Sequence, residues 1–192
     1  MKPGTVRIIG GQYRRTPISI VPVAGLRPTP DRVRETVFNW LEHLLGALDA
    51  IEALDLFAGS GALGFEAASR GARRVVLVEH HPKAAAALMQ LQQRLGAEAV
   101  TVLQSDWQAA AARLAPSSFD LVFLDPPFDA GVLPRALDGA CRLLRPGGLL
   151  YVESASALDK GPEGLPARHR LTLERYGRAG MVHFHLLRAP AS

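Results

Sequence analysis

The sequence predicts an α/β fold with a mostly parallel sheet, and three observations lead to this prediction. From residue 52 onward, short apolar runs alternate with stretches whose apolar residues recur at helical spacing. A glycine-rich loop follows the first of these runs, as expected where a strand turns into a helix. The C-terminal segment instead contains two apolar runs joined by a short glycine-containing turn. We therefore expect helices on both faces of a parallel sheet and an antiparallel hairpin at one edge.

The N-terminal segment is expected to form a small β-hairpin. Residues 6–9 and 18–20 are short strand-like runs on either side of a diglycine at 10–11. Proline and glycine residues then mark a linker, namely Pro22, Gly25 and Pro28. The sequence thus predicts two parts, a basic hairpin with its linker at 1–28 and a main domain at 29–192.

The main domain is expected to begin with a helix, for which Thr29 is the predicted N-cap and Pro30 lies in the first turn. The strands expected after it are residues 53–57, 74–79, 100–103, 119–124 and 149–153, followed by the hairpin strands 171–176 and 181–187. The helices expected between the strands are about residues 61–70, 82–95, 107–114 and 132–144. A seven-stranded, mostly parallel sheet that ends in a hairpin is typical of class I S-adenosylmethionine-dependent methyltransferases, a Rossmann-like fold, rather than of the six-stranded dinucleotide-binding fold.

Composition excludes several classes of protein. Hydrophobic residues make up 48% of the chain and charged residues 21%, which is ordinary for a folded soluble protein. No apolar run approaches the ~20 residues that span a bilayer, and the N-terminus has no signal-peptide pattern. The single cysteine, Cys141, excludes an internal disulfide and suits a reducing cytosol. We therefore expect a cytoplasmic protein without membrane contact, and nothing in the sequence demands more than a monomer.

The net charge of +4 is unevenly distributed along the chain. Residues 1–34 carry seven Lys or Arg against one acid, and residues 160–192 carry six against two. The segment between them carries nine bases against fifteen acids. Two basic ends indicate a polyanionic partner, although a basic surface exposed only to solvent would give the same pattern.

The loop Ala58-Gly59-Ser60-Gly61-Ala62-Leu63-Gly64 fits the pattern G-x-G-x-x-G. Such a loop lets backbone approach a ligand closely, but NAD and FAD proteins share the spacing, and so does a tight turn without a ligand. Asp55 favours S-adenosylmethionine, because a carboxylate here can receive the ammonium group of a methionine moiety but would repel a pyrophosphate. Glu79 ends the next strand, where it can accept both ribose hydroxyls of either cofactor.

A third acid, Asp106, follows the strand expected at 100–103. It can accept the adenine amino group while Trp107 covers the ring, it can cap the helix at 107–114, or it can do both. The predicted binding site for S-adenosylmethionine, with S-adenosylhomocysteine as product, contains Asp55, Phe57, Gly59, Ser60, Gly61, Glu79, Asp106 and Trp107.

The most specific motif is the tetrad Asp125-Pro126-Pro127-Phe128 at the end of a buried strand. Two prolines stiffen the backbone and remove two N–H donors, so the polar groups that remain are acceptors. An amino group offers two donors to such a site, and Phe128 can stack on a flipped base. Acceptors outside the ring plane favour a pyramidal nitrogen that can attack a methyl group, and Asp125 can stabilise the resulting positive charge or take the proton. We predict these four residues as catalytic, the alternative being a strand-ending turn with no substrate.

No second catalytic set competes with the tetrad. The six histidines and Cys141 do not form a metal-binding spacing, so we expect no metal. His183 and His185 share one face of an expected strand and are predicted to be surface or edge residues. There is also no G-x-S-x-G motif.

Four stretches together resemble the RsmD-type 16S ribosomal RNA guanine-N2 methyltransferases: residues 7–12, 26–41, 55–61 and 125–128. The resemblance covers nearly the whole chain, and the two N-terminal stretches are its most family-specific part. It implies a bacterial enzyme that transfers a methyl group from S-adenosylmethionine to the exocyclic N2 amine of a guanine in 16S rRNA. The expected partner is 16S rRNA within an assembled or nearly assembled small ribosomal subunit.

The resemblance also implies roles for particular residues. Asp55, Gly59 and Gly61 would hold the methionine part of the cofactor, Glu79 the ribose, Asp106 the adenine, and residues 125–128 the guanine. The predicted RNA-binding residues are Arg7, Arg14, Arg15, Arg27, Arg32 and Arg34. The first three would contact phosphates irrespective of sequence. For Arg27, Thr29 and Arg32, contact with RNA and contact with the cofactor carboxylate are both open.

Four other functions remain as alternatives. A DNA adenine or cytosine amino-methyltransferase would use the same chemistry, but reading a DNA sequence usually needs an added module that 192 residues leave little room for. A methyltransferase acting on a protein glutamine amide is a second alternative. An RNA-binding or assembly protein without catalytic activity is a third, and an NAD-dependent oxidoreductase is a fourth.

Overall fold

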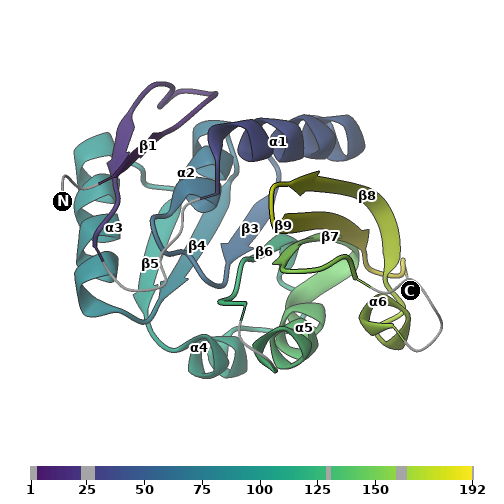
Figure 1. The fold of residues 1–192 in the computed structure, drawn as a ribbon. Coiled ribbons are helices and arrows are strands. Elements are labelled where there is room, and N and C mark those ends of the chain that lie inside the picture. The colour runs from purple at the N-terminus through teal and green to yellow at the C-terminus, as the bar shows by residue number, and fades with distance from the viewer. Residues whose placement is uncertain (1–3, 23–28, 129–130, 159–163, 192) are drawn as a thin grey trace. The chain divides into compact units, whose positions relative to one another are not determined.

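The structure, a computed structural model, describes residues 4–22, 29–128, 131–158 and 164–191 (Figure 1). The chain consists of two compact units, Met1–Trp107 and Gln108–Ser192. Among the described residues, none of the helices combines the length and apolar character that crossing a membrane requires. The domain boundary predicted after residue 28 is not tested by this division and stays a prediction.

The first unit contains a parallel sheet in the order β5-β4-β3. Its strands are β3 (Glu52–Asp55), β4 (Arg74–Glu79) and β5 (Val100–Gln104), and its helices are α1 (Asp31–Leu45), α2 (Ala62–Ser69) and α3 (Pro82–Leu95). Helix α2 packs on β3 and β4, and α3 packs on β4 and β5. The apolar run of β4 is buried from Val75 to Val78, as expected for a parallel strand covered on both faces. The register pairs Asp55 with Leu77, so the acids that end β3 and β4 lie at the same edge of the sheet.

A hairpin of β1 (Thr5–Arg7) and β2 (Pro17–Ser19) lies over α2 and α3 in the first unit (Figure 1). Its loop is attached through backbone groups. The N–H of Tyr13 donates to Ser69 Oγ at 2.9 Å, and the N–H of Gln12 donates to the Ser69 carbonyl at 2.8 Å. Gly11 has a φ of +72°, and a Cβ there would lie 1.8 Å from the Ser69 oxygen. Only glycine therefore allows this close approach of the hairpin loop to α2.

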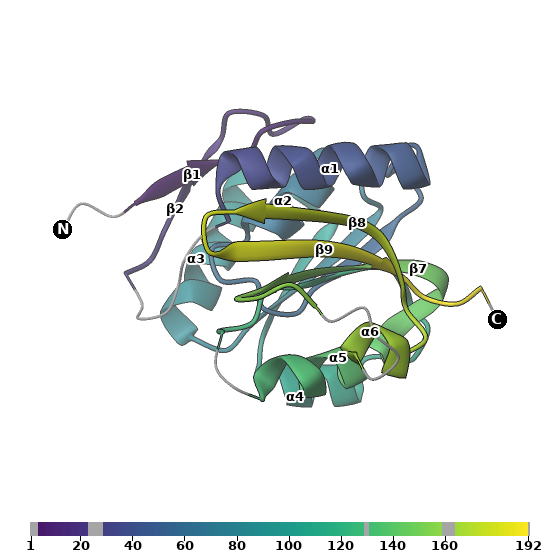
Figure 2. The same ribbon diagram turned by 45° about the vertical axis from the view of Figure 1, so that its right-hand side comes forward.

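The second unit contains the strands β6 (Phe119–Leu124), β7 (Leu144–Ser154), β8 (Thr172–Ala179) and β9 (Val182–Arg188). Its helices are α5 (Val132–Leu143) and α6 (Leu165–Arg168), while α4 (Trp107–Arg113) begins at the last residue of the first unit. Strand β7 runs parallel to β6 and antiparallel to β9. Helix α5 packs on β6 and β7, and the ribbon formed by β8 and β9 extends beside β7 (Figure 2).

The strand order is β5-β4-β3-β6-β7-β9-β8, with β9 the antiparallel insertion between β7 and β8. This is the predicted seven-stranded arrangement, parallel except for its C-terminal hairpin. The α/β fold class expected of a class I methyltransferase is therefore confirmed, together with the N-terminal hairpin.

Two local predictions were wrong, and one short helix was missed. The N-cap of α1 is Pro30, with no side-chain cap, because Thr29 is buried one residue earlier and its carbonyl accepts from Arg34 Nε at 3.2 Å. Strand β7 begins five residues before its predicted start of 149, because Leu144 already pairs with Phe119 across a register shift. The short helix α6 was not predicted, since four residues are too few to show helical periodicity.

Candidate active site

The glycine-rich loop of the first unit needs glycine at its centre. Gly59 and Gly61 have φ values of 52° and 78°, in the left-handed region that side chains disfavour. A Cβ on Gly61 would lie 2.5 Å from the Leu88 side chain of α3. The loop is fixed to the sheet, because the N–H of Ala58 donates to the Val78 carbonyl at 2.9 Å. These contacts leave a tight turn whose backbone can approach a ligand closely.

Glu79 lies at the end of β4, buried, and contacts this loop directly. Its Oε2 accepts from the N–H of Gly59 at 2.9 Å, and its Oε1 accepts from the N–H of His81 at 2.7 Å. Each carboxylate oxygen has a second lone pair, so the side chain keeps acceptor capacity for a hydroxyl group. The structure thus places Glu79 at the glycine loop, and its predicted contact with ribose hydroxyls stays a prediction.

Asp55 is also buried, at the end of β3. Its Oδ2 accepts from the N–H of Gly64 at 3.2 Å, at the start of α2. The positive end of the helix stabilises the charged carboxylate. The first unit therefore holds two buried carboxylates at one edge of its sheet, next to the glycine loop.

Two aromatic residues of the predicted cofactor site contact each other. The ring centroids of Phe57 and Trp107 are 5.7 Å apart at an interplanar angle of 41°. Both rings are partly exposed, so part of their apolar surface is available to a flat ligand. Asp106 is exposed beside Trp107, and its capping and ligand-binding roles stay predictions.

The tetrad of the second unit follows directly on β6. The strand is buried up to Leu124, Asp125 is partly buried, and Phe128 is 46% exposed. Neither proline carries an N–H, so this turn offers acceptors and an exposed aromatic ring. The role predicted for these four residues, binding the amino group of a base, stays a prediction.

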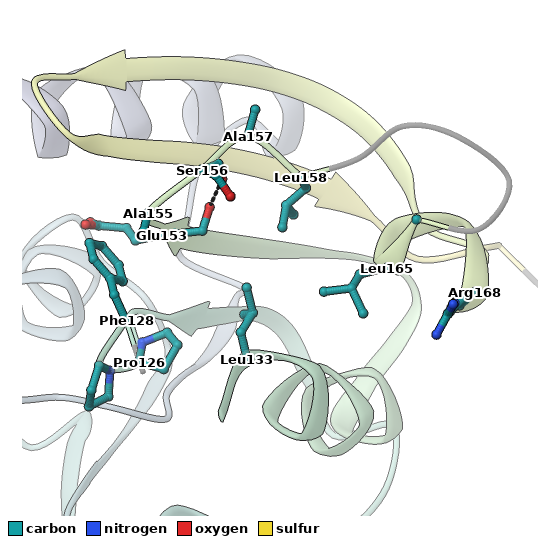
Figure 3. A pocket seen from close by; sticks show the side chains of 13 residues that line it. Pro126, Phe128, Leu133, Glu153, Ala155, Ser156, Ala157, Leu158, Leu165 and Arg168 are labelled. Atoms are coloured by element: carbon teal, nitrogen blue, oxygen red, sulfur yellow. Dashed lines mark hydrogen bonds between the residues drawn. The ribbon is translucent and has the colours of Figure 1, made fainter. Parts of the chain in front are cut away.

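A pocket of about 470 Å³ opens next to the tetrad, within the second unit (Figure 3). Pro126, Pro127 and Phe128 form one side, and residues 153–158 of β7 and the segment after it form another. Leu133, Gly164, Leu165 and Arg168 complete the lining. The volume lies in the range of small-molecule binding sites.

Two residues of this region were missed by the sequence analysis. The hydroxyl of Tyr151 donates to Glu153 Oε1 at 2.7 Å, and both side chains are buried. Burial, with the charges of Glu153 and Asp125, raises the pKa of Tyr151 well above its usual value, so the phenol keeps its proton. Glu153 lines the pocket. A signal existed, because Glu153 follows an apolar run as Asp55, Glu79 and Asp125 do.

Four of the six predicted RNA-binding arginines are exposed: Arg7, Arg14, Arg15 and Arg32. Arg27 lies outside the described residues. Arg34 does not fit the prediction, because its side chain is fully buried between α1 and α2. It pairs with Asp31 at 2.6 Å and Glu66 at 3.6 Å, and burial lowers its pKa against the opposing effect of both acids. A side chain enclosed in this way cannot contact RNA, and its role is structural.

The histidines and the cysteine that the sequence analysis considered show no sign of a second site in the part of the chain that the structure describes. His185 was predicted at the surface or edge but is buried, because the N–H of Leu158 donates to its Nε2 at 3.1 Å and covers it. Burial and Asp138 raise the pKa of Cys141 to about 11, as expected for an inert thiol. Within the described ranges, no group of three or more His, Cys, Asp or Glu side chains is placed to hold a metal ion.

Comparison with known proteins gives consistent matches. The family model described as "Conserved hypothetical protein 95" matches residues 6–187. The chain is 38% identical to the ribosomal RNA small subunit methyltransferase D of Escherichia coli, over 98% of this chain and 92% of that protein. It is 40% identical to the protein of the same name from Haemophilus influenzae, over 79% of each chain.

A solved structure agrees with these sequence matches. The structure of the Escherichia coli protein yhhF superimposes with a TM-score of 0.81 at 36% identity, covering 98% of this chain and 100% of that one. The similarity thus extends over nearly the whole length of both proteins. The chain therefore belongs to the family that contains the ribosomal RNA small subunit methyltransferase D proteins, the RsmD-type family that its sequence motifs resemble.

Proposed function

We propose that this protein transfers a methyl group from S-adenosylmethionine to the N2 amine of one guanine in the 16S rRNA of the small ribosomal subunit. The observation that carries the proposal is the Asp125–Phe128 tetrad, in which two prolines remove backbone donors and leave the Asp125 carboxylate, the proline carbonyls and an aromatic ring beside a pocket of about 470 Å³. Support comes from two relatives that are named for methylation of small-subunit ribosomal RNA.

The first unit has a donor and acceptor set that fits S-adenosylmethionine. The buried carboxylate of Asp55 suits an ammonium group, and that of Glu79 suits hydroxyl groups. Gly59 and Gly61, both at positive φ, would allow backbone contact with the methionine part, and at Gly61 a Cβ would collide with Leu88. Ser60 lies between them, and Phe57, Asp106 and Trp107 would bind the adenine end. When bound, this cofactor supplies an electrophilic methyl group on a sulfonium sulfur.

The residues of the tetrad make the substrate nitrogen nucleophilic. An exocyclic amine shares its lone pair with the ring, so it attacks poorly. Asp125 and the proline carbonyls would accept hydrogen bonds from the amine outside the ring plane and localise the lone pair on nitrogen. Asp125 would then stabilise the positive charge that develops and take the proton as the nitrogen is methylated. Phe128 would stack on the base and hold it in this orientation.

The exposed arginines of the hairpin region would hold the RNA backbone. Arg7, Arg14 and Arg15 lie in or beside the hairpin, and Arg32 lies at the start of α1. Contacts to phosphate give affinity without sequence specificity, so the choice of guanine falls to the pocket and to RNA shape. Because an enzyme of this kind works where ribosomes assemble, we keep the expectation of a cytoplasmic monomer that needs no metal.

Mass mapping of modified nucleosides in ribosomal RNA tests this function. Ribosomal RNA from cells that make the protein should contain one N2-methylguanosine in 16S rRNA that is absent from cells lacking it. Purified protein with S-adenosylmethionine should restore that nucleoside on small subunits from the deficient cells. An unchanged modification pattern, or a methyl group on adenine or cytosine, would contradict the proposal.

A further inference from the structure

We infer that Glu153 selects guanine by accepting a hydrogen bond from the ring N1–H of the base, while Asp125 accepts from the neighbouring amine. This assignment rests on the proposed function, because it concerns recognition in the same pocket. It makes Glu153 a specificity-determining residue of the reaction and gives the second unit a means of distinguishing guanine from other bases that carry an amine.

The strand register brings the two carboxylates together. Strands β6 and β7 are parallel, and Leu124 pairs with Val152. Asp125 and Glu153 each follow one residue later, and side chains at matching positions of parallel strands point to the same face. The Tyr151 hydroxyl contacts Glu153 at 2.7 Å, and the charges of Glu153 and Asp125 both raise the pKa of Tyr151. The second unit thus presents two neighbouring carboxylates at the edge where β6 and β7 end.

Glu153 also lies in the pocket wall. It lines the cavity together with Pro126, Pro127 and Phe128. Figure 3 shows its carboxylate on the same side of the pocket as the Phe128 ring. Only 3% of Glu153 is exposed, so its carboxylate interacts in a medium of low polarity. A base stacked on Phe128 would therefore have its polar edge within reach of Glu153.

Base chemistry shows what this second carboxylate distinguishes. Guanine, adenine and cytosine all carry an exocyclic amine, so Asp125 alone accepts from any of them. Only in guanine is the ring nitrogen next to the amine a donor, because adenine N1 and cytosine N3 are acceptors. A buried carboxylate accepts a hydrogen bond from the guanine N1–H. A base with a ring acceptor at this position is repelled and donates no hydrogen bond to the carboxylate. Two adjacent acceptors therefore match the N1–H and N2–H donors of guanine.

Tyr151 positions the selecting group. Its hydroxyl donates to Glu153 Oε1 at 2.7 Å and thereby fixes one oxygen of the carboxylate. Strand β7 holds both residues, two positions apart and on one face, so the hydrogen bond is set by the strand itself. We expect this bond to orient Glu153 without contributing a donor to the base.

The test compares guanine with 2-aminopurine at the modified position of 16S rRNA, in reconstituted small subunits. 2-Aminopurine keeps the 2-amine but has an acceptor at N1. The wild-type protein should methylate guanine at least ~100-fold faster than 2-aminopurine, as kcat/KM. Glu153→Gln should reduce this preference at least ~10-fold, because an amide can donate to a ring acceptor. 2-Aminopurine also lacks the 6-oxo group of guanine, but this loss should affect the wild type and the Glu153→Gln variant equally. The ratio of their two preferences therefore measures the contribution of the N1 position.

Matched variants complete the experiment. Glu174→Gln removes a charge on β8 that pairs with Arg188, outside the pocket, and should leave the preference unchanged. Tyr151→Phe keeps the Glu153 charge but removes its anchor and should reduce the preference by a smaller factor. If the Glu153→Gln variant does not fold, the preference measured for Tyr151→Phe decides whether Glu153 selects guanine.

Each outcome has a distinct meaning. A preference that is the same in wild type and in the Glu153→Gln variant, or in Tyr151→Phe where that variant decides, overturns the role of Glu153 alone. Failure of the wild-type protein to methylate guanine on the small subunit overturns the proposed function instead.

Discussion

Nη1 of Arg34 lies 3.6 Å from Oε2 of Glu66, and both side chains are fully buried. Among the described residues, this nitrogen has no hydrogen-bond partner. Glu66 also accepts from the backbone N–H groups of Ile9 and Gly10, at 2.7 and 2.8 Å. The buried carboxylate of Glu66 therefore opposes the charge of Arg34 on α1 and also anchors the N-terminal hairpin to α2.

Glu66→Gln should destabilise the protein by about 3–5 kcal/mol, because it removes the buried opposite charge of the Arg34 guanidinium and leaves only the partly exposed Asp31 to pair with it. Urea unfolding followed by circular dichroism measures the change. The control is Glu52→Gln, because its partners Arg73 and Arg74 are substantially exposed. This substitution should lower the stability by about 1 kcal/mol or less. Equal effects of the two substitutions would show that the buried pair has no special role.

Asp125→Ala should lower kcat by about 100-fold or more while binding of S-adenosylhomocysteine stays within about twofold. The reason is that Asp125 would act on the substrate amine, whereas the residues that fit the cofactor lie in the first unit. Transfer of a radiolabelled methyl group to small subunits measures kcat, and calorimetry measures binding. Asp138→Asn, an exposed carboxylate on α5, serves as the control. Near-normal turnover of the Asp125 variant would rule out the mechanism.

Gly61→Ala should weaken S-adenosylhomocysteine binding at least ~10-fold. The new Cβ would meet Leu88 at 2.5 Å, so the loop must move away from its ligand-binding conformation. Gly96→Ala is a matched control, because Gly96 has a φ of +59° but nothing within 4 Å of an added Cβ. It should lose comparable stability from backbone strain and bind the cofactor normally. If both variants bind equally well, the glycine loop does not form the site.

Replacing Arg7, Arg14 and Arg15 together by Ala should weaken binding to small subunits and flatten its dependence on salt. Each lost phosphate contact should reduce the slope of log K against log salt by about 0.7–0.9. Filter binding at several salt concentrations gives the slope, and cofactor affinity should not change. The control replaces three exposed arginines that do not belong to the hairpin segment, namely Arg73, Arg113 and Arg135. An unaltered slope in the hairpin variant would mean that its charges face only solvent.

Periodicity predicted the fold well, because strands such as Arg74–Glu79 and helices such as Pro82–Leu95 bury faces that the sequence marks with apolar residues. The glycine loop and the acids beside it were predictable for a related reason, since polar residues that end parallel strands meet at one edge. Burial of charge was not predictable. Arg34 stands among basic residues in the sequence, and only the structure shows that its side chain is buried and faces Glu66 of α2.

Glu153 and His185 show the same limit in the second unit. Both lie on strands that were predicted, but their environments depend on segments distant in the chain, such as the tetrad after β6 and the backbone at Leu158. The spacing of Tyr151 and Glu153 places both on one face of a strand, but only the structure shows their hydrogen bond and the pocket beside it.

The hairpin is attached to α2 through main-chain N–H groups of Ile9, Gly10, Gln12 and Tyr13. Every residue type except proline supplies such a group, so this attachment places no demand on the exposed side chains at positions 14 and 15. Under the proposed function, substitutions at these two sites would therefore change the affinity for RNA by single charges while the hairpin stays attached to α2.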